Sequence, residues 1–154
     1  SAHEFPNAYD KVSHLSPRAV WVPVERPQDV NADAFKDAVR LLTDWGCAHV
    51  LLKDYVKSAK ADAQRFMKVE VGPDLAELAC EFVAVRGRRF NRGVVFKEWV
   101  PFEHYTTRAG IVTNEWRLFF GRGELLHAVP NSHQDAACDA VPDEMLAAAA
   151  RAAS

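Results

Sequence analysis

The chain has 154 residues, enough for one domain with a substantial hydrophobic core. Its apolar fraction of 49%, charged fraction of 26% and net charge of −2 are typical of a soluble globular protein and give no reason to expect nucleic acid to bind across the surface. No apolar run approaches the roughly 20 residues that span a bilayer, and three dispersed cysteines without a CxxC pair argue against disulfides and zinc and favour a reducing, cytoplasmic setting.

The first third of the chain predicts one short strand and one amphipathic helix. Prolines within residues 1–31 forbid a long helix there, and Ala19–Val22 favours a short strand. Residues Val30–Trp45 form the first helical pattern, with Asn31 as N-cap and Gly46 just past the end. The expected apolar face comprises Phe35, Ala38, Val39 and Leu42.

A buried strand and a second helix follow. Residues Ala48–Leu52 predict a strand that runs directly into charged residues beginning at Lys53. Residues 58–70 are polar and predict a loop with one helical turn. The sequence Gly72–Asp74 starts the second helix, and Gly87 ends it. Its expected apolar stripe comprises Leu75, Leu78, Phe82 and Val85.

The chain is organised around the stretch GVVFKEWVPFE, residues 93–103, which predicts a buried strand. An apolar run is interrupted by the charged pair Lys97 and Glu98, and Pro101 ends the strand because proline cannot donate to a sheet ladder. A carboxylate followed by backbone donors and acceptors beside an apolar surface suits a flat heteroaromatic ring. The alternative, which this stretch alone favours, is an ordinary buried strand whose polar pair points to solvent.

The remainder predicts a hairpin and a terminal helix. Residues Glu103–Thr113 are expected to form a loop, and 116–120 and 124–129 two strands joined by Gly121-Arg122-Gly123. The alanine-rich tail from Pro142 onward predicts a helix. Strands alternating with helices, then a hairpin, indicate a layered domain of the α+β or α/β class.

Charged residues at the ends of these strands form one candidate constellation. Lys53 ends one buried strand, with Lys57 beyond it, and Glu98 ends the next core strand. Glu115 and Arg117 flank Trp116 and share one face of the hairpin, since strand residues two apart point the same way. A polyanion that carries a flat base would satisfy these groups together.

Three segments resemble serial motifs of ATP-grasp proteins, most closely the clade named for two arginines and one lysine. The segments are LLKDYVKSAK, GVVFKEWVPFE and NEWRLFFGRGELL. The likeness extends over roughly residues 9–130, is strongest over 48–129, and has Trp116 where tyrosine is usual. It implies that residues 1–154 form a single α+β domain of the ATP-grasp type, with a mostly antiparallel sheet and packed helices.

The resemblance also implies an ATP site. Glu98 would accept a hydrogen bond from the adenine amino group, the backbone of Trp99 and Val100 would contact the ring edge, and Glu103 would bind the ribose hydroxyls. The other nucleotide-binding residues that the resemblance implies are Lys53, Lys57, Glu115 and Arg117. Lys53 would lie near the α-phosphate or the base, while Lys57 and Arg117 would hold the β- and γ-phosphates as catalytic residues. Arg18 is the candidate for an arginine of the earlier subdomain, although its surroundings match poorly.

The same resemblance implies an ATP-dependent ligase that uses Mg²⁺. Such enzymes phosphorylate a carboxylate of a small molecule or peptide, and an amine or thiol then attacks the acyl phosphate. The usual magnesium motif, an acidic residue on one late strand and Glu-x-Asn on the next, is not found after Val129. The alternatives are a fragment of a longer protein, a shortened nucleotide-binding member, or a non-catalytic module for nucleotide or protein interaction on the same fold.

Other candidate features have simpler interpretations. The basic connector, with Arg86, Arg88, Arg89 and Arg92, is either a phosphate or nucleic-acid patch or a solvated loop after a helix, and the second interpretation is favoured. The six histidines show no HxxxH or HxH spacing, which argues against a histidine metal site. A lysine-adenylating nucleic-acid ligase is rejected because Lys53 is not followed by the required Asp-Gly pair.

Overall fold

The computed structural model describes residues 4–57, 63–102, 104–107, 110–130 and 141–153. The chain forms two compact units, Ser1–Val100 and Pro101–Ser154. Each unit is described by itself below. The sequence prediction of a single domain over residues 1–154 stays a prediction.

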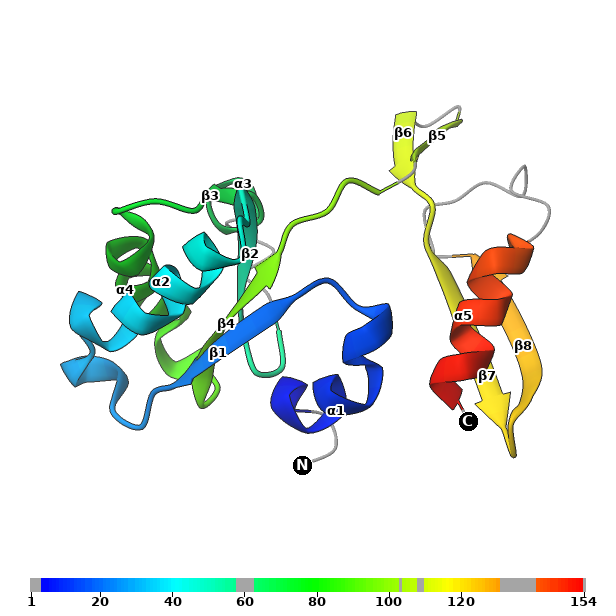
Figure 1. The fold of residues 1–154 in the computed structure, drawn as a ribbon, viewed down its shortest axis with the longest axis horizontal. Helices are drawn as coiled ribbons and strands as arrows, with labels where there is room; N and C mark the ends of the chain where they lie inside the picture. Colours follow the sequence, from blue (N-terminus) through cyan, green and yellow to red (C-terminus); the bar gives the residue numbers. More distant parts are fainter. Residues whose placement is uncertain (1–3, 58–62, 103, 108–109, 131–140, 154) are drawn as a thin grey trace. The chain divides into compact units, whose positions relative to one another are not determined.

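The first unit is built on an antiparallel sheet of four strands with the order β1-β4-β2-β3 (Figure 1). The strands are β1 (Ala19–Pro23), β2 (His49–Asp54), β3 (Val69–Glu70) and β4 (Gly93–Glu98). The helices are α1 (Phe5–Val12), α2 (Lys36–Asp44), α3 (Ala63–Phe66) and α4 (Leu75–Arg86). Short 3₁₀ turns span Ser13–Leu15, Pro27–Asp29, Ala32–Phe35 and Gly87–Arg89.

Strand β4 holds the inner position between β1 and β2, which explains its sequence. Both of its edges donate and accept ladder hydrogen bonds, so a proline within it would leave a partner unpaired. Val94, Val95 and Phe96 are all fully buried, because both faces of this strand are covered. The expectation of a buried strand in this stretch is confirmed over Gly93–Glu98.

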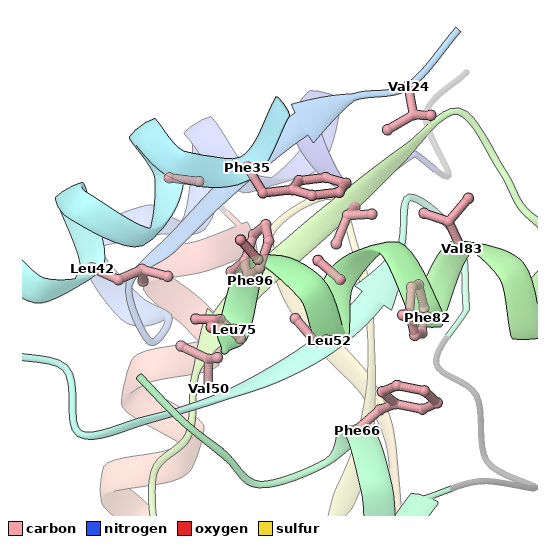
Figure 2. Close-up of a cluster of buried hydrophobic side chains, with 14 of the residues drawn as sticks. Val24, Phe35, Leu42, Val50, Leu52, Phe66, Leu75, Phe82, Val83 and Phe96 are labelled. Carbon is pink, nitrogen blue, oxygen red and sulfur yellow. The ribbon is translucent and has the colours of Figure 1, made fainter. Parts of the chain in front are cut away.

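Helices α2 and α4 cover one face of the sheet and enclose the main hydrophobic core. Figure 2 shows Val50, Leu52 and Phe96 from the strands packed with Phe35 and Phe82 from the helical layer. The helix expected over Val30–Trp45 is divided into the 3₁₀ turn Ala32–Phe35 and α2, and Asn31 caps the 3₁₀ turn, where its side chain accepts a hydrogen bond from the Asp33 N–H at 3.0 Å. Gly46 follows the helix with φ of 68°, a conformation in which a side chain would be strained.

Helix α1 packs against the other face of the sheet. The rings of Phe5 and Tyr9 stack on each other and meet Trp21 of β1 edge-on. The Phe5 N–H donates to the Tyr55 carbonyl at 2.8 Å, and the Tyr9 hydroxyl donates to the Pro17 carbonyl at 3.1 Å. These contacts form a second, smaller apolar cluster on the side of the sheet away from the main core.

The second unit contains two two-stranded antiparallel sheets and a helix. Strand β5 (His104–Thr107) pairs with β6 (Gly110–Thr113), and β7 (Trp116–Gly121) pairs with β8 (Glu124–Pro130). Positive φ angles at Arg122 and Gly123 identify the two-residue β7–β8 turn as type I′, the type that matches strand twist. The predicted terminal helix is α5 (Asp143–Ala153).

Three expectations about the elements were wrong. The first third of the chain contains α1 in addition to the one helix expected there. Residues 104–107 and 110–113 form β5 and β6 rather than the predicted loop, because their threonine, tyrosine, isoleucine and valine residues favour extended structure. The buried stripe of α4 contains Ala79 and Val83, whereas the predicted Val85 is 46% exposed. Helix α4 is apolar on most sides, so the spacing of its apolar residues did not define one buried face.

The loop expected at residues 58–70 is partly helix and strand where the structure describes it. Residues Ala63–Phe66 form α3, which confirms the helical turn, and Val69–Glu70 form the edge strand β3. In β3, Val69 and Glu70 pair with Val50 and His49 of β2. The fold class, α+β with antiparallel sheets, is confirmed.

Candidate functional site

Two lysines lie together on the face of the sheet that carries α1. In the β2–β4 ladder Lys53 lies opposite Val95, and Lys97 lies opposite Leu51, so the two lysines are diagonal neighbours on one face. Asp54 and Glu98 alternate to the other face, where Val50, Leu52 and Phe96 form the core. The lysine face therefore presents two positive charges beside an apolar cluster.

The surroundings of these lysines disfavour their charge. Both side chains are half-buried, and burial lowers the pKa of each ammonium group. The positive charge of Lys53 lowers the pKa of Lys97 further, while Asp54 partly offsets the effect at Lys53. The Phe5 ring centroid lies 5.1 Å from the Lys53 Nζ and 5.8 Å from the Lys97 Nζ, a weak compensation by cation–π attraction.

Glu98 is held by Arg18 in a two-pronged ion pair. The Arg18 Nη2 donates to Glu98 Oε1 at 2.7 Å, and the Arg18 Nε donates to Oε2 at 2.9 Å. The remaining Arg18 nitrogen, Nη1, donates to the Trp45 carbonyl at 2.7 Å, and the guanidinium lies over the Trp45 ring. These hydrogen bonds hold the pKa of the Glu98 carboxyl below its usual value.

One backbone group just after β4 already forms a hydrogen bond with the neighbouring strand. The Trp99 N–H donates to the His49 carbonyl at 2.9 Å, so this donor is not free for the edge of a ring. The Trp99 indole meets His49 edge-on and lies 4.2 Å from the Lys68 Nζ. Val100 is the last residue of the first unit, and it is half-buried.

Lys57 belongs to a tight turn that follows β2. Asp54 Oδ1 accepts hydrogen bonds from the N–H groups of Val56 at 2.8 Å and Lys57 at 2.6 Å. The Asp54 N–H donates back to the Lys57 carbonyl at 3.0 Å, which closes the turn. The Lys57 side chain is exposed. The side chain of Asp54, which holds the turn, leaves β2 on the side of the sheet that faces the main core.

The remaining predicted residues lie in the second unit. Glu115 and Arg117 are exposed and alternate with half-buried Trp116 and Leu118, as expected for residues that share one face. The Trp116 Nε1 donates to Asn114 Oδ1 at 2.9 Å. Glu103 lies outside the described residues. Lys53 and Lys57 belong to the first unit and Arg117 to the second. That these residues form one site therefore stays a prediction.

The sequence analysis missed Lys97 as a partner of Lys53. It treated Lys97 only as part of the charged pair that interrupts an apolar run. The sequence signal for its position was the two-residue alternation of a strand, which places Lys97 and Val95 on one face of β4. Only the register of β2 against β4 shows that Lys53 shares that face.

Comparison with known proteins identifies the family of the chain. The matching family is an ATP-grasp domain family, the third of the clade named for two arginines and one lysine, and its model matches residues 42–154. The chain belongs to this family. No match was found among curated proteins. The matched region contains Lys53, Lys97, Glu98 and Arg117, and the suspected ATP-grasp resemblance is confirmed.

As an ATP-grasp domain of this clade, the chain has an ATP-binding, ligase-type function in general terms. Two half-buried ammonium groups on one sheet face are a donor set that fits a polyphosphate. Within the described ranges, no group of three or more His, Cys, Asp or Glu residues could hold a metal ion. None of the described helices is long and apolar enough to cross a membrane.

Proposed function

We propose that this ATP-grasp domain binds the phosphates of ATP on the sheet face that carries Lys53 and Lys97. The observation that carries the proposal is the desolvation of both ammonium groups. No carboxylate of the described residues forms an ion pair with either lysine. A buried charge without a partner is costly, and a phosphate chain would offset that cost for both groups.

The adenine contact implied for Glu98 is a separate part of this proposal, and it requires the base to pass round the end of β4, because Glu98 alternates to the sheet face opposite the two lysines. A carboxylate has about four acceptor positions, and Arg18 fills three of them through its Nε, Nη2 and backbone N–H. The Cys47 side chain is a further hydrogen-bond partner of this carboxylate, and Oε1 accepts only one of the Arg18 bonds, so Oε1 is the oxygen at which we expect the adenine amino group. In this arrangement Arg18 is a positioning residue, because it fixes the Glu98 carboxylate in its ionised, accepting form.

The proposed reaction is ATP-dependent ligation of a carboxylate to an amine or a thiol. A carboxylate oxygen of the acceptor attacks the γ-phosphorus, and ADP leaves with the electrons of the broken P–O bond. The amine then attacks the acyl carbon, inorganic phosphate leaves, and the amine proton passes to solvent. Lys57 and Arg117 are expected to neutralise the charge of the β- and γ-phosphates. The described residues do not supply a carboxylate set for Mg²⁺, so no step is assigned to the metal.

Calorimetric titration of ATP into the wild-type chain and three lysine variants tests nucleotide binding. Lys53→Ala and Lys97→Ala should each raise the Kd for ATP at least about tenfold, because each removes a charge-assisted contact with phosphate. Lys11→Ala is the matched control, since Lys11 is an exposed lysine of α1. Unchanged affinity in both Lys53→Ala and Lys97→Ala would contradict the proposal.

A non-catalytic nucleotide-binding or interaction module is the second candidate. It is favoured by the lack of a metal-holding group among the described residues. Repeating the ATP titration with Mg²⁺ and then with EDTA separates the two candidates. Magnesium-dependent binding together with ADP release in the presence of a carboxylate and an amine would establish the ligase, whereas magnesium-independent binding without turnover would favour the module.

A further inference from the structure

Helix α1 lies over the two lysines of the proposed phosphate site. The ring centroid of its first residue, Phe5, is 5.1 Å from the Lys53 Nζ and 5.8 Å from the Lys97 Nζ. The same ring stacks on Tyr9 and meets Trp21 of β1 edge-on. One aromatic side chain of the protein itself therefore lies beside both ammonium groups.

The Phe5 ring and a phosphate group compete for the space beside these lysines. A phosphate oxygen accepts a hydrogen bond from an ammonium group at about 2.7–2.9 Å. An oxygen at that distance, on the line from the Lys53 Nζ to the ring centroid, would lie well inside the about 3.5 Å at which non-bonded atoms are in van der Waals contact. A phosphate that bridges the two lysines on this side of the sheet therefore requires Phe5 to move.

The ring is a weak substitute for an anion. Cation–π attraction extends to about 6 Å from a ring centroid, and both Nζ atoms lie near that limit. Burial lowers the pKa of both lysines, so the ring does not compensate for the water that the ammonium groups have lost. Charge-assisted hydrogen bonds to a phosphate would compensate for that loss directly. Replacement of the ring by a phosphate is therefore favourable for the lysines.

Helix α1 buries little of itself against the sheet. It spans only the eight residues Phe5–Val12, and none of them is fully buried. The Phe5 N–H donates to the Tyr55 carbonyl at 2.8 Å, and Glu4, just before the helix, forms an ion pair with exposed Arg92 at 3.3 Å. An isolated helix shorter than about 12 residues is marginal in water. We therefore expect α1 to lose its helical structure when it leaves the sheet.

We propose that α1 is an autoinhibitory segment that occupies the phosphate-binding face while ATP is absent. In this closed form Phe5 covers Lys53 and Lys97, and ATP binds to molecules in which α1 has left the face. The inference rests on the proposed ATP site and adds that α1 sets the apparent affinity of that site. Because only the open molecules bind, the apparent Kd equals the intrinsic Kd divided by the open fraction.

Hydrogen exchange of the wild-type chain, with and without saturating ATP, tests this inference. The informative amides are those of residues 9–12, whose hydrogen bonds close the helical turns of α1. ATP should speed their exchange at least about threefold, because displaced α1 loses these hydrogen bonds. The amides of β2, measured in a peptide covering residues 49–54, are the internal control and should not exchange faster, since the sheet stays folded.

Calorimetric titration of ATP into Phe5→Ala provides a second readout. Removal of the ring opens the lysine face, so the Kd for ATP should fall at least about threefold. Lys11→Ala is the matched control, because it changes an exposed side chain of the same helix, and it should alter the Kd less than about twofold. Thermal unfolding followed by circular dichroism verifies that each variant keeps its fold.

The outcomes distinguish failure of the autoinhibition from failure of the ATP site. ATP binding by the wild type without faster exchange in α1 would overturn the autoinhibition alone. An unchanged or higher Kd in Phe5→Ala would do the same, because the ring would then not oppose binding. Absence of ATP binding in both the wild type and Phe5→Ala would overturn the ATP site and the autoinhibition with it. Binding by Phe5→Ala alone would support both.

Discussion

Lys53 and Lys97 carry their charges at positions where burial in the folded chain opposes the charged form. Their ammonium groups are half-buried on the same sheet face, and burial lowers the pKa of both. A folded-state pKa below the unfolded value means that folding disfavours the charged form of the side chain. Such a cost persists in functional sites because the ligand, rather than the protein, supplies the opposite charge.

Replacing Lys97 with methionine should stabilise the ligand-free chain while weakening ATP binding. The stability gain should be about 1 kcal/mol at pH 7, because a desolvated charge is replaced by an apolar side chain of similar length. The sign of this stability change follows from the lowered pKa of Lys97. The free-energy cost of burying the charged Lys97 side chain is fully present below its folded-state pKa. This cost is relieved as the pH rises from the folded-state pKa towards the unfolded-state pKa of 10.5.

Urea denaturation at pH 7 and at pH 10 measures this effect. The difference between Lys97→Met and the wild type should therefore shrink at the higher pH. Lys11→Met, which replaces an exposed lysine of α1, is the matched control measured in parallel. A Lys97→Met variant that is less stable than the wild type at pH 7 would show that Lys97 is already satisfied in the ligand-free fold.

At the scale of single residues, sequence patterns located Lys53 and Glu98 but not what surrounds them. Glu98 could be singled out because the strand before it is apolar. Its partner Arg18 lies 80 positions away in the chain, and no local pattern links the two. The diagonal pairing of Lys53 with Lys97 depends on strand register, which period-two alternation alone does not specify.

At the scale of elements, β4 organises the first unit because it pairs with β1 and β2 at once. Its first residue, Gly93, lies where β1, β4 and the turn after β2 converge. A Cβ atom added there would lie 2.5 Å from the Tyr55 ring and 2.6 Å from the Val22 carbonyl oxygen. The Val22 backbone is held in the β1–β4 ladder, so it cannot move aside without loss of strand pairing.

Gly93→Ala should therefore destabilise the first unit by about 2 kcal/mol, the cost of overpacking against fixed neighbours. Gly72→Ala is the matched control, because a Cβ there would meet nothing within 4 Å. That change should alter the free energy of unfolding by less than about 0.5 kcal/mol. Chemical denaturation compares the two variants, and equal effects would mean that Tyr55 and β1 shift to accept the methyl group.

The elements that sequence predicted well are those with a strong local signal. Asn31 caps the 3₁₀ turn before α2 and Gly46 follows the end of α2. The apolar run of β4 marks an inner strand, and Arg122-Gly123 forms the expected hairpin turn. The β5–β6 hairpin was missed because loop signals around Gly110 were given more weight than the β propensity of its flanks. The buried face of α4 was misassigned because tertiary contacts, not periodicity, select one face of an apolar helix.

At the scale of the whole molecule, burial is distributed unequally between the two units. The main core, with Phe35, Leu52, Phe82 and Phe96, belongs to Ser1–Val100. Among residues of the second unit whose exposure is described, Asn114 alone is buried. Phe119 is 52% exposed and Leu126 is 68% exposed, so the β7–β8 hairpin encloses little apolar surface of its own. A two-stranded hairpin with so little burial is marginally stable.

Hydrogen exchange should therefore proceed in two distinct classes of amides. The amides of β2 and β4 should exchange only through global opening of the first unit, since both strands border a fully buried core. Those of β7 and β8 should exchange at least about tenfold faster, a difference of about 1.4 kcal/mol in opening free energy. Mass spectrometry of peptides covering 49–54, 93–98, 116–121 and 124–130 measures both classes in one experiment. Equal protection in all four peptides would mean that the hairpin opens only together with the core, and the predicted single domain over residues 1–154 would then gain its first direct support.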